Sequence, residues 1–305
     1  MQLHVIDETA RLRSVILGIA HQNGPTPNLE VAYDPKSRFH IAQNTYPLEG
    51  DMIDELNAFA EVLQRYEVEV FRPEIIANCN QIFSRDIGFV VDDFFIKSNI
   101  LPDRDREIEA IEQVLSRIDP SKILTPPSEV HVEGGDVMLH GEHLFVGYYN
   151  QPDYAKTITA RTNIQAVEWL SSQFSHKKIK AFELRKSNTD PFTNALHLDC
   201  CFQPVGDRYA IIHSEGFMLQ EDADYLTNLF GAEQLFHISA QEMYEMNSNI
   251  FSISPGVVVS DHSFVRLNSW LRSKGLTVEP IPFREIAKQE GLLRCTTLPL
   301  FRDPK

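Results

Sequence analysis

The run Ile87-Gly88-Phe89-Val90-Val91-Asp92-Asp93-Phe94-Phe95-Ile96 begins the pattern that decides the fold. Two short apolar stretches flank a turn-prone pair of aspartates, and this arrangement predicts a β-hairpin. Downstream, the apolar residues of 105–118 recur at spacings of three and four, as they do on one face of an α-helix. A further apolar stretch at 123–125 predicts a third strand. The module is therefore a strand, a turn, a second strand, a helix and a third strand.

This module recurs along the chain. The second copy has predicted strands at 136–139, 144–146 and 179–184 with a helix at 163–174. The third has strands at 198–202, 209–212 and 235–239 with a helix at 221–230. The fourth has strands at 249–253, 257–260 and 277–281 with a helix at 263–274. A fifth copy is split between the termini. Its first strand is predicted at 295–300, its second at 13–18, its helix at 52–66 and its third strand at 68–71.

Five similar units, the last of which takes strands from both termini, predict a closed ring, because closure removes exposed sheet edges. The expected fold class is α/β, a five-bladed pseudo-symmetric α/β propeller of repeated ββαβ units. No Gly/Ser-rich linker interrupts the series, so we expect one catalytic domain spanning residues 1–305. The long polar stretch 23–50 is a candidate lid over the site.

The composition limits the classes of partner. Acidic residues outnumber basic ones by 43 to 28, and a net charge of −15 would be repelled by nucleic acid and by anionic membranes. A small cationic molecule is the favoured partner. The N-terminal residues do not resemble a signal peptide and no stretch of about 18 apolar residues occurs, so a cytoplasmic location is expected. The four cysteines lack zinc-site spacing, and neither a metal nor a cofactor is expected.

Polar residues occupy the start of the first strand in every repeat. They are Arg85-Asp86, Glu133-Gly134-Gly135-Asp136, His197-Leu198-Asp199, Asn249 and Arg294-Cys295. A pseudo-symmetric ring carries equivalent positions to its axis. These residues are therefore predicted to converge on one central pocket, although they are far apart in the sequence.

The motifs around these positions are Asn80-Gln81-Ile82-Phe83-Ser84-Arg85-Asp86, Glu133-Gly134-Gly135-Asp136-Val137, Arg161-Thr162-Asn163, Asn194-Ala195-Leu196-His197-Leu198-Asp199 and Arg294-Cys295-Thr296-Thr297-Leu298-Pro299-Leu300. With these motifs in this order along the sequence, the chain resembles the arginine deiminase and amidinotransferase superfamily. Its members are the guanidino-group-modifying enzymes also called penteins. Dimethylarginine dimethylaminohydrolase shares their five-bladed α/β-propeller fold.

The resemblance implies a role for each residue. Cys295 would be the nucleophile, His197 the acid and base, and Glu133 the residue that orients the imidazole. Asp86 and Asp199 would hold the substrate guanidinium through bidentate hydrogen bonds. The bound cation or a protonated His197 would stabilise the thiolate, since nearby carboxylates oppose it.

Four further residues are candidates for substrate binding: Asp136, Arg161, Asn249 and Arg85. Asp136 would join the grip on the cation or tie down the Gly134-Gly135 turn. Arg161 would bind a substrate carboxylate or mark the start of a helix. Each main candidate also has a structural alternative: Asp86 could pair with Arg85, His197 could be a satisfied core residue, and Cys295 could be a small buried hydrophobe.

Three functions remain open at this point. The first is hydrolysis of arginine or a related guanidino compound to a ureido product with release of ammonia or an alkylamine. The second is transfer of the amidino group to an amine such as glycine, and the third is a non-catalytic binding propeller. The segment 288–294 before Cys295 lacks the glycine-rich run of arginine deiminases, so the expected recognition of a substrate carboxylate is altered. The sequence leaves the oligomeric state open, a homo-oligomer included.

Overall fold

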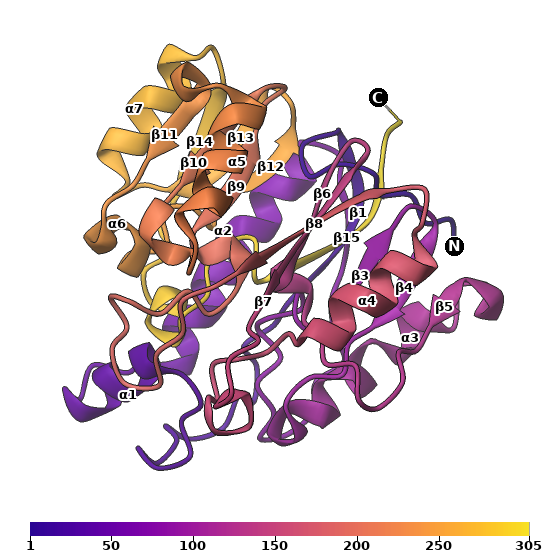
Figure 1. Cartoon of the computed structure of the whole chain (residues 1–305). Helices are drawn as coiled ribbons and strands as arrows, with labels where there is room; N and C mark the ends of the chain where they lie inside the picture. The colour runs from indigo at the N-terminus through magenta and orange to yellow at the C-terminus, as the bar shows by residue number, and fades with distance from the viewer. Residues whose placement is uncertain (305) are drawn as a thin grey trace.

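A computed structural model describes residues 1–304 of the chain, apart from the side chain of Asp103. Within these residues the strands form five sheets of three strands (Figure 1). In each sheet the first two strands are antiparallel and the third joins in parallel. The predicted five-bladed α/β propeller is confirmed.

The blades follow the chain in order. The strands of the first four are β3 (Gly88–Val91), β4 (Phe94–Lys97) and β5 (Ile123–Leu124); β6 (Val137–His140), β7 (His143–Tyr148) and β8 (Lys178–Glu183); β9 (Phe202–Val205), β10 (Tyr209–Ile212) and β11 (Leu235–His237); β12 (Phe251–Ser254), β13 (Val257–Asp261) and β14 (Thr277–Ile281). The fifth blade consists of β15 (Thr297–Arg302), β1 (Leu12–Leu17) and β2 (Glu69–Phe71). The two ends of the chain therefore close the ring, as predicted.

The α-helices connect the second and third strands of the blades or lie in the segments between blades. They are α1 (Pro35–Ala42), α2 (Glu49–Arg65), α3 (Glu112–Leu115), α4 (Ile164–Gln173), α5 (Gln220–Phe230), α6 (Ala240–Tyr244) and α7 (Val265–Ser273). Figure 1 shows α4 and α7 on the outside of the strands of their blades. No helix in residues 1–304 is long and apolar enough to cross a membrane.

The helix predicted at 105–118 is wrong in type. Residues Pro102–Ile111 form a 3₁₀ helix, η1, and only α3 continues as α-helix. Residues i and i+3 eclipse one another in a 3₁₀ helix. Here that geometry places Arg104 and Glu107 together, and the two side chains form a buried, two-bonded ion pair with both N–O distances at 2.8 Å.

The start of several first strands is also corrected. Gly134–Asp136 and Leu198–Cys200 are short 3₁₀ turns, η3 and η5, and the adjoining strands begin only at Val137 and Phe202. His197 therefore precedes this turn and Asp199 lies within it, so the two do not share a strand face. The turn is closed by the Cys200 N–H, which donates to His197 O at 3.1 Å. Polar residues thus sit in the turns that lead into the strands.

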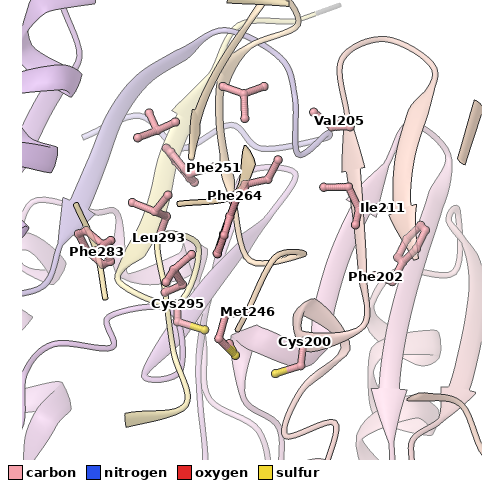
Figure 2. Packing of buried hydrophobic residues seen from close by; sticks show 14 of the residues in the cluster. Cys200, Phe202, Val205, Ile211, Met246, Phe251, Phe264, Phe283, Leu293 and Cys295 are labelled. Atoms are coloured by element: carbon pink, nitrogen blue, oxygen red, sulfur yellow. The ribbon is translucent and has the colours of Figure 1, made fainter. Parts of the chain in front are cut away.

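The core holds these turns in place. Cys295 belongs to the same buried cluster as Cys200, Phe202 and Phe251. Figure 2 shows Cys295 beside Leu293 among these packed side chains. Because close-packed interiors resist movement, the backbone at Cys295 is held in place by this cluster.

Candidate active site

Cys295 lies in the turn before β15 and is clamped through its backbone and its side chain. Its N–H donates to Asn249 Oδ1 at 3.1 Å, and its carbonyl accepts from Arg85 N–H at 3.0 Å. Asn249 Nδ2 lies 3.1 Å from the sulfur and donates to it. Asn249, predicted as a substrate contact, is therefore placed on the nucleophile.

The Cys295 thiol is held in its protonated form. Burial raises its pKa well above the ordinary value, and the carboxylates of Asp199 and Asp86 raise it further. The sulfur lies 3.7 Å from Asp199 Oδ2 and 3.9 Å from Oδ1. A thiolate would be repelled by these oxygens, so a positive charge beside the sulfur would favour its ionisation.

His197 and Glu133 form a buried hydrogen-bonded pair. His197 Nε2 donates to Glu133 Oε2 at 2.8 Å, and His197 Nδ1 lies 3.8 Å from Asp86 Oδ1. Burial lowers the pKa of His197, but Asp86, Asp136 and Glu133 outweigh it and raise the pKa to about 9. Burial opposes ionisation of Glu133, yet Arg161 and His197 hold its pKa well below the ordinary range. The imidazole is therefore an imidazolium at neutral pH.

The glycines of the Glu133–Asp136 turn allow this close packing. A Cβ atom on Gly135 would lie 2.6 Å from the His197 ring, nearer than real Cβ contacts permit. A side chain at this position would displace the imidazole. Asp136 sits at the end of the same turn, where its Oδ1 accepts the Leu198 N–H at 2.9 Å. It thereby ties the turn of Glu133 to the turn of His197.

A small cavity of about 20 Å³ brings four predicted residues together: Cys295, His197, Asp86 and Arg161. Tyr33 and Arg104 also line this cavity. Such a volume holds about one water molecule. A larger cavity of about 660 Å³ adjoins it and shares Tyr33, Phe83 and Arg104 with it. The candidate lid, 23–50, supplies Tyr33 to both walls.

Asp86 presents one free oxygen at this site. Its Oδ2 accepts from Arg104 Nη1 at 2.9 Å, whereas its Oδ1 is buried and has no hydrogen-bond partner in residues 1–304. Burial raises its pKa, with His197 and Arg104 acting in the opposite direction. The partner of Asp86 is thus Arg104, and the alternative of a local pair with Arg85 is not observed.

Arg161 is anchored on three sides. Its Nη1 lies 3.3 Å from both oxygens of Glu133, its Nε donates to Ile158 O, and its Nη2 donates to Tyr33 O at 3.1 Å. Its guanidinium also faces the Tyr33 ring at 5.6 Å. Arg161 precedes the helix cap Asn163, but its contacts link the lid to the His197–Glu133 pair.

Asp199 lies behind Cys295 and is fully buried. Its Oδ2 accepts from Arg294 Nη1 at 2.8 Å, and the other nitrogens of Arg294 donate to both oxygens of Glu8 at 3.0 and 3.2 Å. Burial raises the pKa of Glu8, but Arg294 and Arg85 prevail and hold it at about 2. The N-terminal segment therefore helps to fix the residue next to the nucleophile.

Arg85 lies in this supporting layer. Its Nε lies 3.4 Å from Arg294 O and its Nη2 lies 3.4 Å from Thr297 Oγ1. Burial lowers the pKa of Arg85 to about 9, and the neighbouring Arg294 charge acts in the same direction. Its contacts support the backbone around Cys295, and its predicted role in substrate binding stays a prediction.

Asp86, Glu133 and His197 each offer one metal-ligand atom within 4.8 Å of the others. The contacts already on the page argue against a cation there. Glu133 Oε2 accepts the His197 proton, and Arg161 and Arg104 lie 3.3 and 3.7 Å from the same oxygen. Two guanidinium groups and an imidazolium would repel a metal ion, and the absence of a metal stays a prediction.

Several residues of the site were missed from the sequence. Arg104 and Glu107 lie in a run of alternating charges that is typical of a solvated surface, and no local signal separates them from their neighbours. Tyr33 and Asp34 lie in the polar stretch considered only as a lid. Glu290 lies five residues before Cys295, in the segment noted for its departure from the deiminase pattern, and that departure was the available signal.

Known proteins match this chain in sequence and in structure. A model of the family described as N,N dimethylarginine dimethylhydrolase, eukaryotic, matches residues 27–302. The uncharacterized protein YkgA of Bacillus subtilis is 28% identical over 251 residues, which are 82% of this chain and 80% of that protein. Arginine deiminase of Staphylococcus aureus is 30% identical over 213 residues, but these cover 57% of this chain and 48% of the deiminase.

The fold has a close counterpart among solved structures. The N-terminal domain of ArgZ, a cyanobacterial arginine dihydrolase bound to product, aligns with a TM-score of 0.78 at 14% identity and covers 95% of this chain and 97% of that one. At this identity the likeness shows the fold alone. The family match extends over nearly the whole chain, and the chain therefore belongs to the N,N dimethylarginine dimethylhydrolase family, within the superfamily of guanidino-group-modifying pentein enzymes.

Proposed function

We propose that this protein is a cysteine hydrolase that acts on the guanidinium group of arginine or a related guanidino compound. The products would be a ureido compound and ammonia or an alkylamine. One observation carries the proposal: Cys295, His197 and Asp86 line the same small cavity, and Asp86 Oδ1 has no hydrogen-bond partner in residues 1–304. The family match and the partial likeness to arginine deiminase support the same class of reaction.

Substrate binding would prepare the nucleophile. A guanidinium ion has planar N–H donors, and the free Oδ1 of Asp86 is an acceptor for them. The same cation would offset the negative charge of Asp86 and Asp199, which now keeps Cys295 protonated. The thiol would then release its proton to solvent water, because His197 already carries its proton, and Asn249 would donate to the resulting thiolate.

The reaction would proceed in two halves. The Cys295 thiolate attacks the central guanidinium carbon, and the His197 imidazolium gives its proton to the departing amine, which leaves an amidino-thioether on the sulfur. Neutral His197 then takes a proton from a water molecule that adds to the same carbon. The C–S bond breaks, the sulfur takes the remaining proton from the protonated ureido group, and the neutral product leaves, so that the thiol and the imidazolium of the resting site are restored.

Glu133 would act through His197. It holds Nε2 at 2.8 Å and thereby orients Nδ1 toward Asp86. Its negative charge also favours the imidazolium that the first half of the reaction needs. Glu133 is therefore a positioning residue in this mechanism.

The cations on the cavity wall would recognise a substrate carboxylate. Arg161 and Arg104 both line the small cavity, and their guanidinium groups lie 5.6 and 6.0 Å from the Tyr33 ring. This pair would replace the carboxylate recognition that arginine deiminases obtain from the segment before the nucleophile. Because the small cavity has a volume of only about 20 Å³, side chains that it shares with the adjoining 660 Å³ cavity, such as Tyr33, would have to move for substrate to enter.

The test is product analysis by mass spectrometry after incubation with arginine, methylarginines and other guanidino compounds, each with and without glycine. Ureido products without glycine are expected. Guanidinoacetate that appears only with glycine would instead identify an amidinotransferase. If no compound is converted and Cys295 forms no adduct, the proposal is wrong and a binding protein becomes the better hypothesis.

A further inference from the structure

A buried carboxyl group that the mechanism does not use lies near the small cavity. Glu107 belongs to the 3₁₀ helix η1 and is only 4% exposed. It lines the 660 Å³ cavity but not the small cavity that Cys295 lines. Both of its oxygens accept from Arg104, through Nε and Nη2 at 2.8 Å each. Arg104 lines both cavities, so Glu107 is connected to the small cavity through this arginine.

Arg104 divides its guanidinium between two carboxyl groups. Its Nε and Nη2 bind Glu107, whereas its Nη1 donates to Asp86 Oδ2 at 2.9 Å. Nη1 also lies 3.7 Å from Glu133 Oε2. Asp86 therefore gives one oxygen to Arg104, and its Oδ1 has no hydrogen-bond partner in residues 1–304.

This division differs from the pairing that Arg104 and Asp86 favour by themselves. A guanidinium and a carboxylate form their strongest contact through two parallel N–H···O bonds. A rotation of the Arg104 guanidinium that brings a second nitrogen to Asp86 Oδ1 would produce this contact. It would also consume the oxygen that the proposed function assigns to the substrate cation. Glu107 opposes the rotation because it binds the other edge of the guanidinium.

The Glu107 carboxyl group is unfavourable at its position. Burial raises its pKa to about 7, against the charge and the hydrogen bonds of Arg104. The charges of Asp86 and Glu133 act in the same direction as burial. Replacement of a buried ion pair by apolar side chains is often neutral or stabilising. Stability alone therefore does not account for a carboxyl group here.

We propose that Glu107 is a positioning residue that keeps Arg104 from binding both oxygens of Asp86, so that Asp86 Oδ1 stays available to the guanidinium of the substrate. This inference rests on the proposed function and adds to it a residue outside the small cavity. It also gives η1 a function, since the i, i+3 spacing of a 3₁₀ helix places Glu107 beside Arg104. Loss of the Glu107 charge should therefore weaken the binding of every guanidine, with or without a carboxylate.

Two probes separate this role from recognition of a substrate carboxylate. L-arginine carries a guanidinium and a carboxylate, whereas butylguanidine carries the guanidinium alone. Dissociation constants are measured by calorimetry in the Cys295→Ala background, and kcat and KM for L-arginine are measured with Cys295 intact. Glu107→Gln should raise both dissociation constants by about 10- to 150-fold, the effect of losing a hydrogen bond between charged groups. It should raise KM by a larger factor than it lowers kcat.

A double variant keeps the test valid if Glu107→Gln folds poorly. Arg104→Gln/Glu107→Gln removes both charges of the pair and leaves no guanidinium that can occupy Asp86. It should bind butylguanidine at least as tightly as the Cys295→Ala parent does. Glu107→Asp retains the charge and should bind both probes more tightly than Glu107→Gln does. The matched control is Glu109→Gln, which removes an exposed charge from η1 and should leave both dissociation constants within about twofold.

A crystal structure of Glu107→Gln tests the geometry directly. Arg104 should donate to both oxygens of Asp86 in this variant. An Arg104 that stays on Oδ2 alone, with Oδ1 still unpaired, would overturn the proposal.

The binding data distinguish the two proposals. If Glu107→Gln weakens L-arginine but not butylguanidine, Glu107 serves carboxylate recognition alone and the positioning role is wrong. A double variant that binds butylguanidine as weakly as Glu107→Gln does would also overturn that role, because the defect would then not arise from Arg104. Both results leave the proposed function intact. If the unsubstituted enzyme converts neither probe and Cys295→Ala binds neither, the proposed function fails and the positioning role fails with it.

Discussion

Asn249 offers the sharpest test of how the nucleophile is stabilised. Its Nδ2 donates to Cys295 Sγ and its Oδ1 accepts the Cys295 N–H, both at 3.1 Å. A hydrogen bond to an ionised group contributes about 1.5–3 kcal/mol. Asn249→Ala should therefore lower kcat/KM by about 10- to 150-fold and slow the alkylation of Cys295 by iodoacetamide.

Asn249→Asp separates the two hydrogen bonds. It keeps an acceptor for the Cys295 N–H but places a negative charge where the amide donated to sulfur. At 3.1 Å two like charges repel by about 5 kcal/mol with an effective dielectric constant of about 20. If the donor to the thiolate matters, Asn249→Asp should be less active than Asn249→Ala at every pH from 6 to 9.

The assay is ureido-product formation at several substrate concentrations, combined with iodoacetamide inactivation followed by intact mass. Asn247→Ala is the matched control, because Asn247 is equally buried in the same loop and its Oδ1 has no hydrogen-bond partner in the described chain. If Asn249→Asp is about as active as the wild type, the reasoning is refuted. The hydrogen bond from the Cys295 N–H to residue 249 would then be sufficient for activity, and the donor to sulfur would not matter.

Three other outcomes are expected. Cys295→Ala should abolish turnover but retain substrate binding in calorimetry, because the carboxylates survive; retained turnover would exclude this nucleophile. Asp86→Asn should raise KM by about 10- to 150-fold through loss of a charged hydrogen bond, and an unchanged KM would place the cation elsewhere. Burial lowers the pKa of His197, but the negative charges of Asp86, Asp136 and Glu133 outweigh this effect and raise the pKa from 6.5 to about 9 in the folded protein. Its contribution to the free energy of unfolding, up to about 3 kcal/mol, is complete below pH 6.5 and is lost as the pH rises through 9. In urea titrations the wild type should therefore lose more stability than His197→Gln over this range, and equal losses would contradict the raised pKa.

Much of the fold could be predicted because each blade repeats the same hydrophobic pattern. The antiparallel pair around Asp92-Asp93, the strand Tyr209–Ile212 and the helix at 163–174 appear within one or two residues of their predicted positions, whereas β9 begins four residues later than predicted. Hydrophobic periodicity could not separate η1 from an α-helix, because an apolar face at spacings of three and four is compatible with both. Within η1, Arg104 pairs with Glu107 three residues on and also with Asp86 eighteen residues away, and the second contact is a tertiary one that the local pattern does not show.

Only the site residues at equivalent positions of the repeats could be predicted from the sequence. Equivalent turns of different blades bring Cys295, His197 and Glu133 together, as expected from their places in the repeats. Residues outside the repeat positions, such as Tyr33 and Arg104, reach the cavity through segments whose path depends on tertiary packing. No local pattern encodes such a path.

The internal guanidinium groups change how a substrate cation can be held. Asp86 gives one oxygen to Arg104 and Asp199 gives one to Arg294, at 2.9 and 2.8 Å. The bidentate grip predicted for each carboxylate would require displacing a buried arginine, and breaking a buried ion pair costs about 3–5 kcal/mol. A planar guanidinium in the small cavity can instead donate to the remaining Oδ1 of Asp86, which lines that cavity, whereas Asp199 does not. This arrangement keeps both arginines in place, and it brings the positive charge into the cavity that Cys295 also lines.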